Sequence, residues 1–454
     1  MNASLSDKIT YRTAQVAVVG MGYVGLPLAL AFAKAGFVTI GVEIDAERVE
    51  QLNAGNSYIE DVAGDELLPH LREGRLRATT DYAVVRDCDA VFICVPTPYT
   101  IQRTPDLSYI ISATEGIAPY LHAGQLIVLQ STTYPGTTTE VVQPVLERVS
   151  GLSAAADDFY LAFSPERIDP GNQQWSAYNT PKVVGGLTPN ATAAAAALLR
   201  QMGAPVHEVS SPSAAELTKL LENTFRAVNI ALVNEMAQLA ERMGIDFWEV
   251  IDAAKTKPFG FMPFRPGPGV GGHCIPIDPY YLLWKAREYD FYTRFIELAA
   301  ETNEAMPYHV VDLVTRGLSA AGKPLRGARA LVLGVAFKPD IGDSRDTPAE
   351  RVIELLLGRG AEVQYHDPYV PAFHVGGNVF YNEALTLEST PLTDGVLQAA
   401  DVVVIVTGHH NVDYGRVLQQ ASLVVDSCNA TVAVCRGGFT GAARVIRLGA
   451  PLTL

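Results

Sequence analysis

The sequence predicts an α/β chain in which a long central helix joins two doubly wound domains. Short, continuously apolar segments alternate with helical segments before residue 208 and again after Arg329, as in parallel sheets with helices on both faces. Between them, an unbroken helical pattern runs from Ala214 to Met243. We therefore expect domains at 1–208, 209–318 and 319–454, since 454 residues exceed one ordinary domain.

Composition narrows the class of protein. The formal net charge of −15 argues against nucleic acid or an anionic membrane as a partner, because both favour basic surfaces. The uncharged segment 14–33 is interrupted by glycines and Pro27, so a buried strand–turn–helix explains it better than a membrane span or a signal sequence. We expect a soluble, cytoplasmic protein.

Cysteine and histidine spacing gives no sign of a metal. The five cysteines form no CxxC pair, which argues against a disulfide framework or structural zinc. No HExxH motif is present, and the adjacent pair His409-His410 is expected in a loop. We therefore expect no metal site.

A glycine motif follows the first predicted strand, 16–19. Gly20, Gly22 and Gly25 have the GxGxxG spacing and open an apolar helix, and the next strand, 38–42, ends in Glu43. Such glycines let the backbone approach a pyrophosphate at the helix N-terminus, and the acidic residue binds ribose hydroxyls and disfavours a 2′-phosphate. This Rossmann-like pattern predicts NAD binding; a turn needed only for packing is the alternative.

Three more strands of the first domain end in polar turns: 90–95, 126–129 and 160–163. The last is followed by Ser164-Pro165-Glu166. Ligands of open α/β sheets bind at the carboxyl ends of strands, so Glu166 is a candidate site residue. Its alternative role is to stabilise a helix N-terminus.

The central helix is expected to begin with Ser211 as N-cap and Pro212 at the first position, and to end at Gly244. Spacings of four and three place Lys219, Asn223 and Arg226 on one face, as a functional stripe or a solvated one. We expect the neighbouring apolar positions to mark the packed side: Leu220, Leu221, Val228, Ile230 and Leu232. The helix is also the expected dimer surface.

A loop dense in glycine and proline, 266–278, contains Cys274 and, four residues later, Asp278. Its backbone can closely approach a ligand, and a cysteine is a capable nucleophile once a nearby lysine favours the thiolate. A buried structural role fits Cys88 and Cys94 better, because they lie in or beside an apolar strand. His273 is a candidate base or a structural histidine.

The last third contains a second doubly wound unit without the glycine motif. A strand at 330–333 precedes a capping box at 347–350, another strand lies at 362–365, and 400–406 resembles 88–94. Lys338 and Arg345 follow the first of these strands. They are candidates for phosphate contacts, with paired surface charges as the alternative.

Together these segments resemble the nucleotide-sugar 6-dehydrogenases, the family of UDP-glucose and UDP-N-acetylhexosamine dehydrogenases. The resemblance covers nearly the whole chain. Its motifs are GMGYVGLP, VPTP, STTYPG, FSPER, ELTKLLENTFRAVNIALVNE, PGPGVGGHCIPIDPYYL, FKPD and DSRDTPAE.

The resemblance implies a role for each matched position. NAD would contact Gly20, Gly22, Tyr23, Val24, Gly25, Glu43, Arg48, Thr97, Thr132 and Arg345. Catalysis would use Cys274 as nucleophile, Lys219 for the hydroxyl proton and the oxyanion, with Asn223, Asp278, Thr132 and, for thioester hydrolysis, Glu166. The UDP-sugar would contact Glu166, Arg167, Ile168, Lys219, Asn223, Arg226, Arg265, Gly271 and Lys338.

The implied reaction is a four-electron oxidation of a sugar C6 hydroxyl, through a thiohemiacetal and a thioester on Cys274, with two NAD consumed. UDP-glucose enzymes of this family usually carry Phe-Pro-Lys where this chain has Ile275-Pro276-Ile277. With Arg226, this favours the N-acetylhexosamine branch, and UDP-N-acetylglucosamine most, for surface-polysaccharide precursors. UDP-N-acetylmannosamine, UDP-N-acetylgalactosamine and UDP-glucose stay open, as does an assembly larger than a homodimer.

Two other functions fit parts of the sequence. A simple two-electron dehydrogenase would share the NAD motif and the long helix but would not need Cys274. A non-catalytic nucleotide-binding protein on the same scaffold is also conceivable, because fold alone does not fix function. The Gly271-Gly272-His273-Cys274 loop argues against the simple dehydrogenase, and the combination of Lys219, Asn223 and Cys274 argues against the non-catalytic protein.

Overall fold

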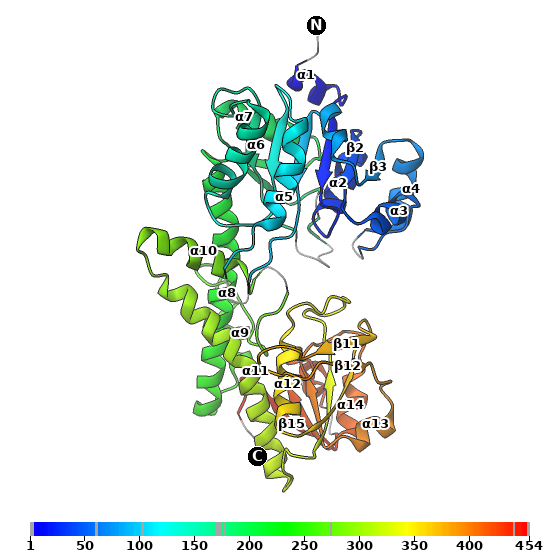
Figure 1. The fold of residues 1–454 in the computed structure, drawn as a ribbon. Coiled ribbons are helices and arrows are strands. Elements are labelled where there is room, and N and C mark those ends of the chain that lie inside the picture. Colours follow the sequence, from blue (N-terminus) through cyan, green and yellow to red (C-terminus); the bar gives the residue numbers. More distant parts are fainter. Residues whose placement is uncertain are drawn as a thin grey trace. The chain divides into compact units, whose positions relative to one another are not determined.

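The computed structural model describes residues 4–59, 62–100, 104–168, 174–176, 178–272, 275–438 and 441–451 (Figure 1). The chain divides into two compact units. The first comprises Met1–Glu222 and Tyr280–Phe291, and the second Asn223–Pro279 and Tyr292–Leu454. Each unit is built around its own sheet, so the predicted fold class, two doubly wound domains with a long helix, is confirmed.

The first unit contains an eight-stranded sheet in the order β3-β2-β1-β4-β5-β6-β7-β8. All neighbouring strands are parallel except β6 and β7, which are antiparallel. The predicted parallel sheet is therefore mixed at this edge. The strands are β1 Gln15–Val19, β2 Val38–Val42, β3 Leu76–Thr79, β4 Ala90–Ile93, β5 Leu126–Leu129, β6 Tyr160–Phe163, β7 Lys182–Gly186 and β8 Val206–Glu208.

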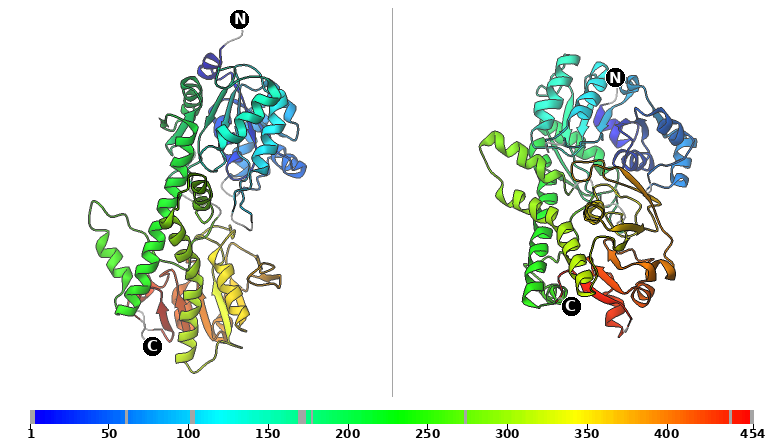
Figure 2. Two further views of the ribbon diagram at one scale, coloured as in Figure 1. Left: turned by 60° about the vertical axis from the view of Figure 1, so that its left-hand side comes forward. Right: turned by 60° about the horizontal axis from the view of Figure 1, so that its bottom comes forward.

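Helices cover both faces of this sheet (Figure 2). Successive strand residues point to opposite faces, and along β1 Val16 and Val18 join one apolar cluster while Ala17 and Val19 join the other. The helices of the N-terminal segment are α1 Leu5–Thr10, α2 Gly25–Lys34, α3 Ala46–Asn53, α4 Gly64–Arg72, α5 Ser108–Ile117, α6 Gln143–Ser150 and α7 Pro189–Arg200, with short turns η1 Tyr82–Asp87, η2 Ala118–Tyr120 and the π-helical η3 Thr138–Val142.

Helix α8, Pro212–Met243, begins and ends where the sequence predicts. The Ser211 hydroxyl accepts a hydrogen bond from the Ala214 amide (3.2 Å), and Gly244 adopts a left-handed φ of +71°. The predicted packed side is wrong in part. Leu220 is buried, but Leu221 and Leu232 are 63% and 56% exposed. Small residues such as Ala227 and Ala231 pack instead, because they allow close approach of neighbouring backbone.

The second unit contains a parallel sheet in the order β10-β9-β13-β14-β15 and a separate antiparallel hairpin, β11–β12. The strands are β9 Arg329–Leu333, β10 Glu362–His366, β11 Ala372–Val375, β12 Leu385–Glu388, β13 Val402–Ile405, β14 Leu423–Asp426 and β15 Arg444–Arg447. The remaining helices of the chain are α9 Phe247–Ala254, α10 Asp278–Ala286, η4 Arg287–Tyr289, α11 Arg294–Ala320, α12 Pro348–Gly358, α13 Asp394–Ala399, α14 Tyr414–Gln420 and α15 Val432–Arg436.

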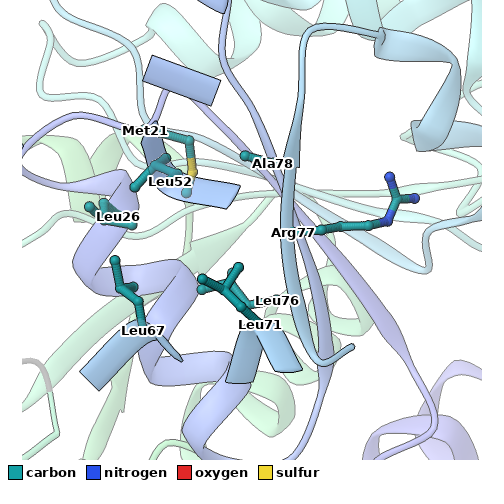
Figure 3. Close-up of a pocket in the computed structure, with 8 residues that line it drawn as sticks. All are labelled: Met21, Leu26, Leu52, Leu67, Leu71, Leu76, Arg77 and Ala78. Atoms are coloured by element: carbon teal, nitrogen blue, oxygen red, sulfur yellow. The ribbon is translucent and has the colours of Figure 1, made fainter. Parts of the chain in front are cut away.

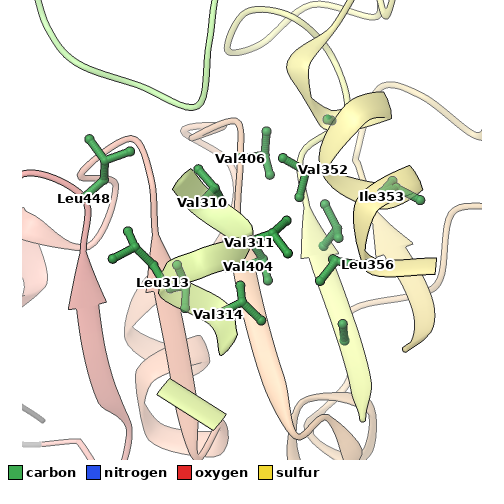
Figure 4. Close-up of a cluster of buried hydrophobic side chains, with 14 of the residues drawn as sticks. Val310, Val311, Leu313, Val314, Val352, Ile353, Leu356, Val404, Val406 and Leu448 are labelled. Atoms are coloured by element: carbon green, nitrogen blue, oxygen red, sulfur yellow. The ribbon is translucent and has the colours of Figure 1, made fainter. Parts of the chain in front are cut away.

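The core of the second unit lies between one face of its sheet and helices α11 and α12. Figure 4 shows Val310 and Val314 of α11 near Val404 of β13, with Val352 and Leu356 of α12 in the same cluster. Helix α12 begins as predicted, since the Thr347 hydroxyl accepts from the Ala349 amide (3.3 Å). The expected reciprocal bond of a capping box is replaced, because the Glu350 carboxylate accepts from Asn378 (3.5 Å).

Candidate active site

The turn between β1 and α2 contains the three motif glycines, and each has a different surrounding. Gly20 has a φ of +88°, and a Cβ there would lie 2.8 Å from the Cys94 carbonyl oxygen. A Cβ on Gly25 would overlap the carbonyl oxygen of Gly20, whereas a Cβ on Gly22 would meet no atom within 4 Å. The first and third glycines are therefore required by packing, and the second leaves open space at the start of α2.

The N-terminus of α2 has no side-chain cap, and in its first turn the Leu26 amide donates to the Gly22 carbonyl (3.1 Å) while Pro27 has no amide hydrogen. Val24 is the N-cap and provides no side-chain hydrogen bond to the first turn. Uncapped amides at a helix N-terminus bind anions such as a pyrophosphate. Tyr23, beside the open glycine, is about half exposed.

Glu43 is buried at the end of β2 and supports this turn. Its Oε2 accepts from the Met21 amide (3.0 Å) and its Oε1 from the Asp45 amide (3.2 Å). Tyr58 donates its hydroxyl to the Met21 carbonyl (2.7 Å), and the Arg48 guanidinium lies 5.0 Å from the Tyr58 ring centroid. Burial and the charge of Glu43 raise the pKa of Tyr58 to about 12, so the hydroxyl stays a donor.

Sequence reasoning found Glu43 and Arg48 but missed Tyr58. It lies in a loop, where no periodicity indicates its contacts.

Thr97 and Thr132 follow the neighbouring strands β4 and β5. The Thr97 carbonyl accepts from the Tyr281 hydroxyl, and the residue is buried. Thr132 is half-buried, and the preceding Ser131 hydroxyl donates to the Val95 carbonyl (2.7 Å), which ties the two loops together. Both threonines therefore lie at the carboxyl edge of the sheet, the edge that carries the glycine turn.

Glu166 forms a buried ion pair that the sequence did not indicate. Lys182 Nζ, at the start of β7, donates to both carboxylate oxygens at 2.9 and 2.8 Å. The Gln130 amide donates to Oε2 (3.0 Å), and the amides of Arg167 and Ile168 donate to Oε1 (2.8 and 3.1 Å). Residues 164–168 form a loop, so Glu166 does not start a helix.

The Arg167 guanidinium points to the first half of α8. Its Nε and Nη2 donate to the two carboxylate oxygens of Glu222 (3.2 and 2.6 Å), and Nη1 donates to the Pro181 carbonyl (2.7 Å). Ile168 is half-buried, and its amide is used by Glu166. Glu222 is a second partner that spacing alone could not identify.

The predicted catalytic stripe of α8 is buried at two of its three positions. Lys219 and Asn223 are buried, and Arg226 is exposed. The Asn223 amide donates to the carboxylate of Asp278, the first residue of α10 (2.5 Å). Within the described ranges Lys219 forms no hydrogen bond or ion pair. His273 and Cys274 lie outside the described residues.

The glycine-rich loop before Cys274 packs against the segment that follows β9. A Cβ on Gly271 would lie 2.8 Å from Pro348 Cδ and 2.9 Å from Phe337 Cβ, and Gly272, at a φ of +85°, faces the Phe337 ring. The Gly272 amide donates to the Arg345 carbonyl (3.3 Å). This part of the loop is thus held by the segment that carries Lys338 and Arg345.

The other end of the loop is held by a buried amide pair. The Asn234 side chain accepts from the Gly267 amide (2.9 Å) and donates to Asn303 (2.9 Å). Both asparagines are buried, on α8 and α11.

The remaining predicted substrate residues are more open. Arg265 is exposed and Lys338 is half-buried. The Arg345 guanidinium pairs with Asp343 (Nη2 to Oδ2, 2.6 Å). Such a pair of surface charges is the alternative to a phosphate contact that the sequence left open.

Two cysteines and two histidines for which the sequence predicts no catalytic role have structural surroundings. Cys88 and Cys94 are buried; burial raises the pKa of the Cys88 thiol to about 12 and also raises that of Cys94. His409 and His410 lie in a loop and bind Asp367 (3.0 Å) and Asp340. Across the described positions, no three His, Cys, Asp or Glu side chains are grouped to hold a metal ion.

A small pocket lies elsewhere in the first unit. It is lined by side chains of α2, α3, α4 and β3 that are almost all apolar, and the Arg77 guanidinium points away from them (Figure 3). Apart from the exposed Arg77, these residues belong to the core, and none of them is a predicted site residue. Among the helices that the structure describes, none is long and apolar enough to cross a membrane.

Three consecutive regions match domains of one family. Residues 14–203 match the NAD binding domain of the UDP-glucose/GDP-mannose dehydrogenase family, 213–305 its central domain and 331–433 its UDP binding domain. The first match contains the glycine turn and Glu43, and the second contains α8 and the cysteine loop.

Relatives and solved structures agree. A UDP-N-acetyl-D-glucosamine 6-dehydrogenase of Pseudomonas aeruginosa is 38% identical over 79% of this chain and 83% of its own. A UDP-N-acetyl-D-mannosamine dehydrogenase of Pyrococcus horikoshii is 36% identical over 87% and 89%. A solved structure of UDP-D-ManNAc dehydrogenase from Pyrococcus horikoshii has a TM-score of 0.85 at 32% identity, covering 96% of this chain and 99% of that one. The chain therefore belongs to the UDP-glucose/GDP-mannose dehydrogenase family, as an NAD-dependent nucleotide-sugar dehydrogenase.

Proposed function

We propose that the protein oxidises the C6 hydroxymethyl group of a UDP-N-acetylhexosamine, namely UDP-N-acetylglucosamine, to the carboxylate, as a precursor of surface polysaccharide. The observation that carries this proposal is the buried pair of Asn223 and Asp278. Cys274 precedes Asp278 by four residues, so at most about 14 Å can separate their Cα atoms. A polar, buried pair tied to a loop cysteine suits a covalent oxidation.

The stoichiometry of the proposed reaction determines which chemical steps the site must support. One primary alcohol, two NAD⁺ and one water give one carboxylate, two NADH and three protons. The Cys274 thiolate bonds to C6 of the intermediate aldehyde and retains it as a thiohemiacetal. After the second oxidation the thioester is cleaved by water, which breaks the C–S bond and returns the thiol.

Two side chains of α8 would manage the charge that develops on oxygen. Lys219, one turn before Asn223, is buried and has no partner among the described residues. Its amine would take up the proton of the substrate hydroxyl, and the ammonium so formed would stabilise an oxyanion. The carboxylate of Asp278 fixes the Asn223 amide by accepting one of its hydrogens. A preorganised cation and amide need no rearrangement as the charge appears.

The first unit fits NAD. Gly22 offers open space where a backbone can approach a pyrophosphate, and α2 begins without a side-chain cap. Glu43 and Arg48 would hold the adenosine end, and Val24, Thr97 and Thr132 would line the rest. When bound, the cofactor supplies the hydride acceptor for each oxidation.

The choice of sugar is supported by the relatives' names and by one local departure. A UDP-N-acetyl-D-glucosamine 6-dehydrogenase of Salmonella typhi is 36% identical over 80% of this chain. The segment between Cys274 and Asp278 is Ile275-Pro276-Ile277 and so carries no cation; Ile275 is half-buried and Ile277 is buried. UDP-N-acetylmannosamine, UDP-N-acetylgalactosamine and UDP-glucose are the alternatives.

A substrate panel with NADH counted per sugar tests the proposal. We expect two NADH per UDP-N-acetylglucosamine consumed, and lower kcat/KM for the other three UDP-sugars. Cys274→Ala should abolish uronic acid formation, whereas Cys435→Ala, at an exposed cysteine, should leave it unchanged. One NADH per sugar, or full product from Cys274→Ala, would contradict the covalent route.

We also propose a homodimer formed through the second half of α8. Large apolar side chains that are exposed there recur every three to four residues, on one side of the helix: Leu232, Met236, Leu239 and Met243. Such a stripe on a free helix would contact water at a cost. Leu239→Glu should reduce the mass measured by light scattering to that of one chain; an unchanged dimer would place the interface elsewhere.

A further inference from the structure

The ion pair between Lys182 and Glu166 lies inside the first unit, away from solvent. Lys182 is 1% exposed and Glu166 8%. Charges are rarely buried in a protein, since removing them from water is energetically costly. Lys182 opens β7, which runs antiparallel to β6, and this reversal brings it to the carboxyl end of β6, where Glu166 lies.

The pair holds the carboxylate in one place. Lys182 contacts both oxygens, so it can stay bound while either oxygen changes its other contacts. The other donors are the neutral Gln130 amide and the backbone amides of Arg167 and Ile168. Among these donors Lys182 alone carries a positive charge, and it alone can balance the carboxylate.

Two further titratable groups lie near the carboxylate. The Cys94 thiol, at the end of β4, is buried, and burial and the charge of Glu166 raise its pKa, so it stays neutral. The Arg167 guanidinium is committed to Glu222 and the Pro181 carbonyl. Neither group can replace Lys182 as the counter-charge.

We propose that Lys182 is a positioning residue for thioester hydrolysis, which keeps Glu166 ionised and aligned as the base that activates water. This inference rests on the proposed function. In the step, water oxygen bonds to the thioester carbon and passes a proton to one oxygen of Glu166, while Lys182 stays on the other. The C–S bond then breaks, the thiolate leaves, and Glu166 and the new carboxyl group release their protons to solvent.

The charge balance predicts a pH dependence. A buried carboxylate without a counter-charge favours its protonated form. Removal of Lys182 would leave the Glu166 carboxylate without this counter-charge, and a protonated Glu166 cannot act as the base. Hydrolysis should then become slow near neutral pH and recover as the pH rises.

The test follows the covalent adduct on Cys274 in a single turnover, by quenching and intact-protein mass spectrometry. Lys182→Met should slow decay of the adduct about tenfold or more at pH 7, with recovery toward pH 9, and leave adduct formation within about twofold. Lys182→Arg keeps the charge and should restore most of the rate. Lys285→Met removes another buried lysine, paired with Glu140 and Glu288, and should not shift the pH profile.

A double-mutant cycle separates positioning from structure. Glu166→Gln alone should slow adduct decay at every pH, and adding Lys182→Met to it should slow decay no further. This double variant has no unpaired buried charge, so it should fold as well as Glu166→Gln. If Lys182→Met alone does not fold, Lys182→Gln, which keeps a donor without the charge, should show the same pH shift.

The outcomes distinguish the proposals. Equal slowing by Lys182→Met with and without Glu166, or slowing without a pH shift, would overturn the inference about Lys182 while leaving the covalent route intact. Normal adduct decay in Glu166→Gln would overturn it as well. Absence of any adduct in the native protein, with one NADH per sugar, would instead refute the proposed function.

Discussion

The two doubly wound sheets of this chain begin with the same turn and use it differently. Gly20 after β1 and Gly334 after β9 both have left-handed φ values, +88° and +82°. In both, the added Cβ would meet a carbonyl oxygen of the loop after the neighbouring strand, Cys94 in one sheet and Thr407 in the other. The glycine is thus demanded by the sheet, and its presence alone does not indicate a dinucleotide.

The acidic residues that follow the second strand of each sheet, Glu43 and Asp367, differ more in their hydrogen bonds than the two glycines do in their surroundings. Glu43 accepts two backbone amides, one on each oxygen. Asp367 accepts from the amides of Val335, Ala336, Tyr369 and Val370 and from His409. Glu43 therefore retains acceptor capacity for ribose hydroxyls, whereas the capacity of Asp367 is filled by the protein.

The helix after the turn also differs. In the first sheet α2 begins at Gly25, directly after the turn, while in the second the chain continues to Pro348 before α12 begins. The intervening segment contains Lys338 and Arg345. The first turn leads directly into a helix N-terminus, and the second leads into a segment that contains two cationic side chains, one of them paired with Asp343. The comparison teaches that the class of ligand depends mainly on the residues that follow the first strand of each sheet, and only secondarily on the fold.

The largest effect is expected at Gly25. Gly25→Ala places a methyl group onto the Gly20 carbonyl, a backbone atom that cannot move aside, and should destabilise the first unit by about 3 kcal/mol or more. This loss of stability corresponds to a fall of about 10 °C in the melting temperature, measured by circular dichroism.

Gly22→Ala is the matched control for that variant. With no atom within 4 Å it should melt within about 2 °C of the native chain and yet bind NAD⁺ roughly tenfold more weakly, by isothermal calorimetry. Native NAD⁺ affinity in Gly22→Ala would show that the open space is not the pyrophosphate site.

A loss of stability without a loss of NAD⁺ affinity is expected at Asp367. Burial alone would raise the pKa of this carboxyl, but hydrogen bonds from His409 and the backbone amides outweigh burial and lower it. Asp367→Ala leaves these donors unpaired and should cost about 3 kcal/mol at pH 7 in urea unfolding. Asp312→Ala, at an exposed pair with Arg316, should change stability by less than about 0.5 kcal/mol.

The sign of the pH effect follows from the lowered pKa. The carboxylate contributes stability that is fully present above its unfolded pKa of about 3.9 and is lost as the pH falls through the lower folded value. The difference between the native chain and Asp367→Ala should therefore be constant from pH 5 to 8 and shrink below about pH 4. A constant difference down to pH 3 would assign the loss to packing alone.

A smaller effect, confined to the cofactor, is expected at Glu43. Glu43→Ala removes the acceptor for ribose hydroxyls and the support of Met21, and should weaken NAD⁺ binding about tenfold, or 1.4 kcal/mol, in a calorimetric titration. Glu47→Ala, exposed in the first turn of α3, is the control. A variant that melts earlier but binds NAD⁺ normally would make Glu43 a structural residue like Asp367.

Several elements were predictable because their signals are local. The capped start of α8 at Ser211, the glycine turn and the strands β5 and β6 lie where sequence patterns place them. Motifs point to Glu43, Asn223 and Asp278 as site residues, and the structure places Asn223 beside Asp278, while their roles stay predictions. The sequence did not indicate four further residues, because each of them contacts a partner remote in sequence: Lys182, Gln130, Glu222 and Tyr58.

By itself, the sequence determined which segments are strands and helices, where the glycines stand and which family the chain resembles. These properties depend on periodicity, caps and turn residues within a few positions of one another. Tertiary structure alone decided that β7 runs antiparallel to β6 and that Lys182 neutralises Glu166. It also decided that hydrogen bonds from the protein fill the acceptor positions of Asp367 but not those of Glu43. The reason is physical: a buried charge is set by the groups that strand order brings within hydrogen-bonding distance, and strand order is a property of the whole sheet.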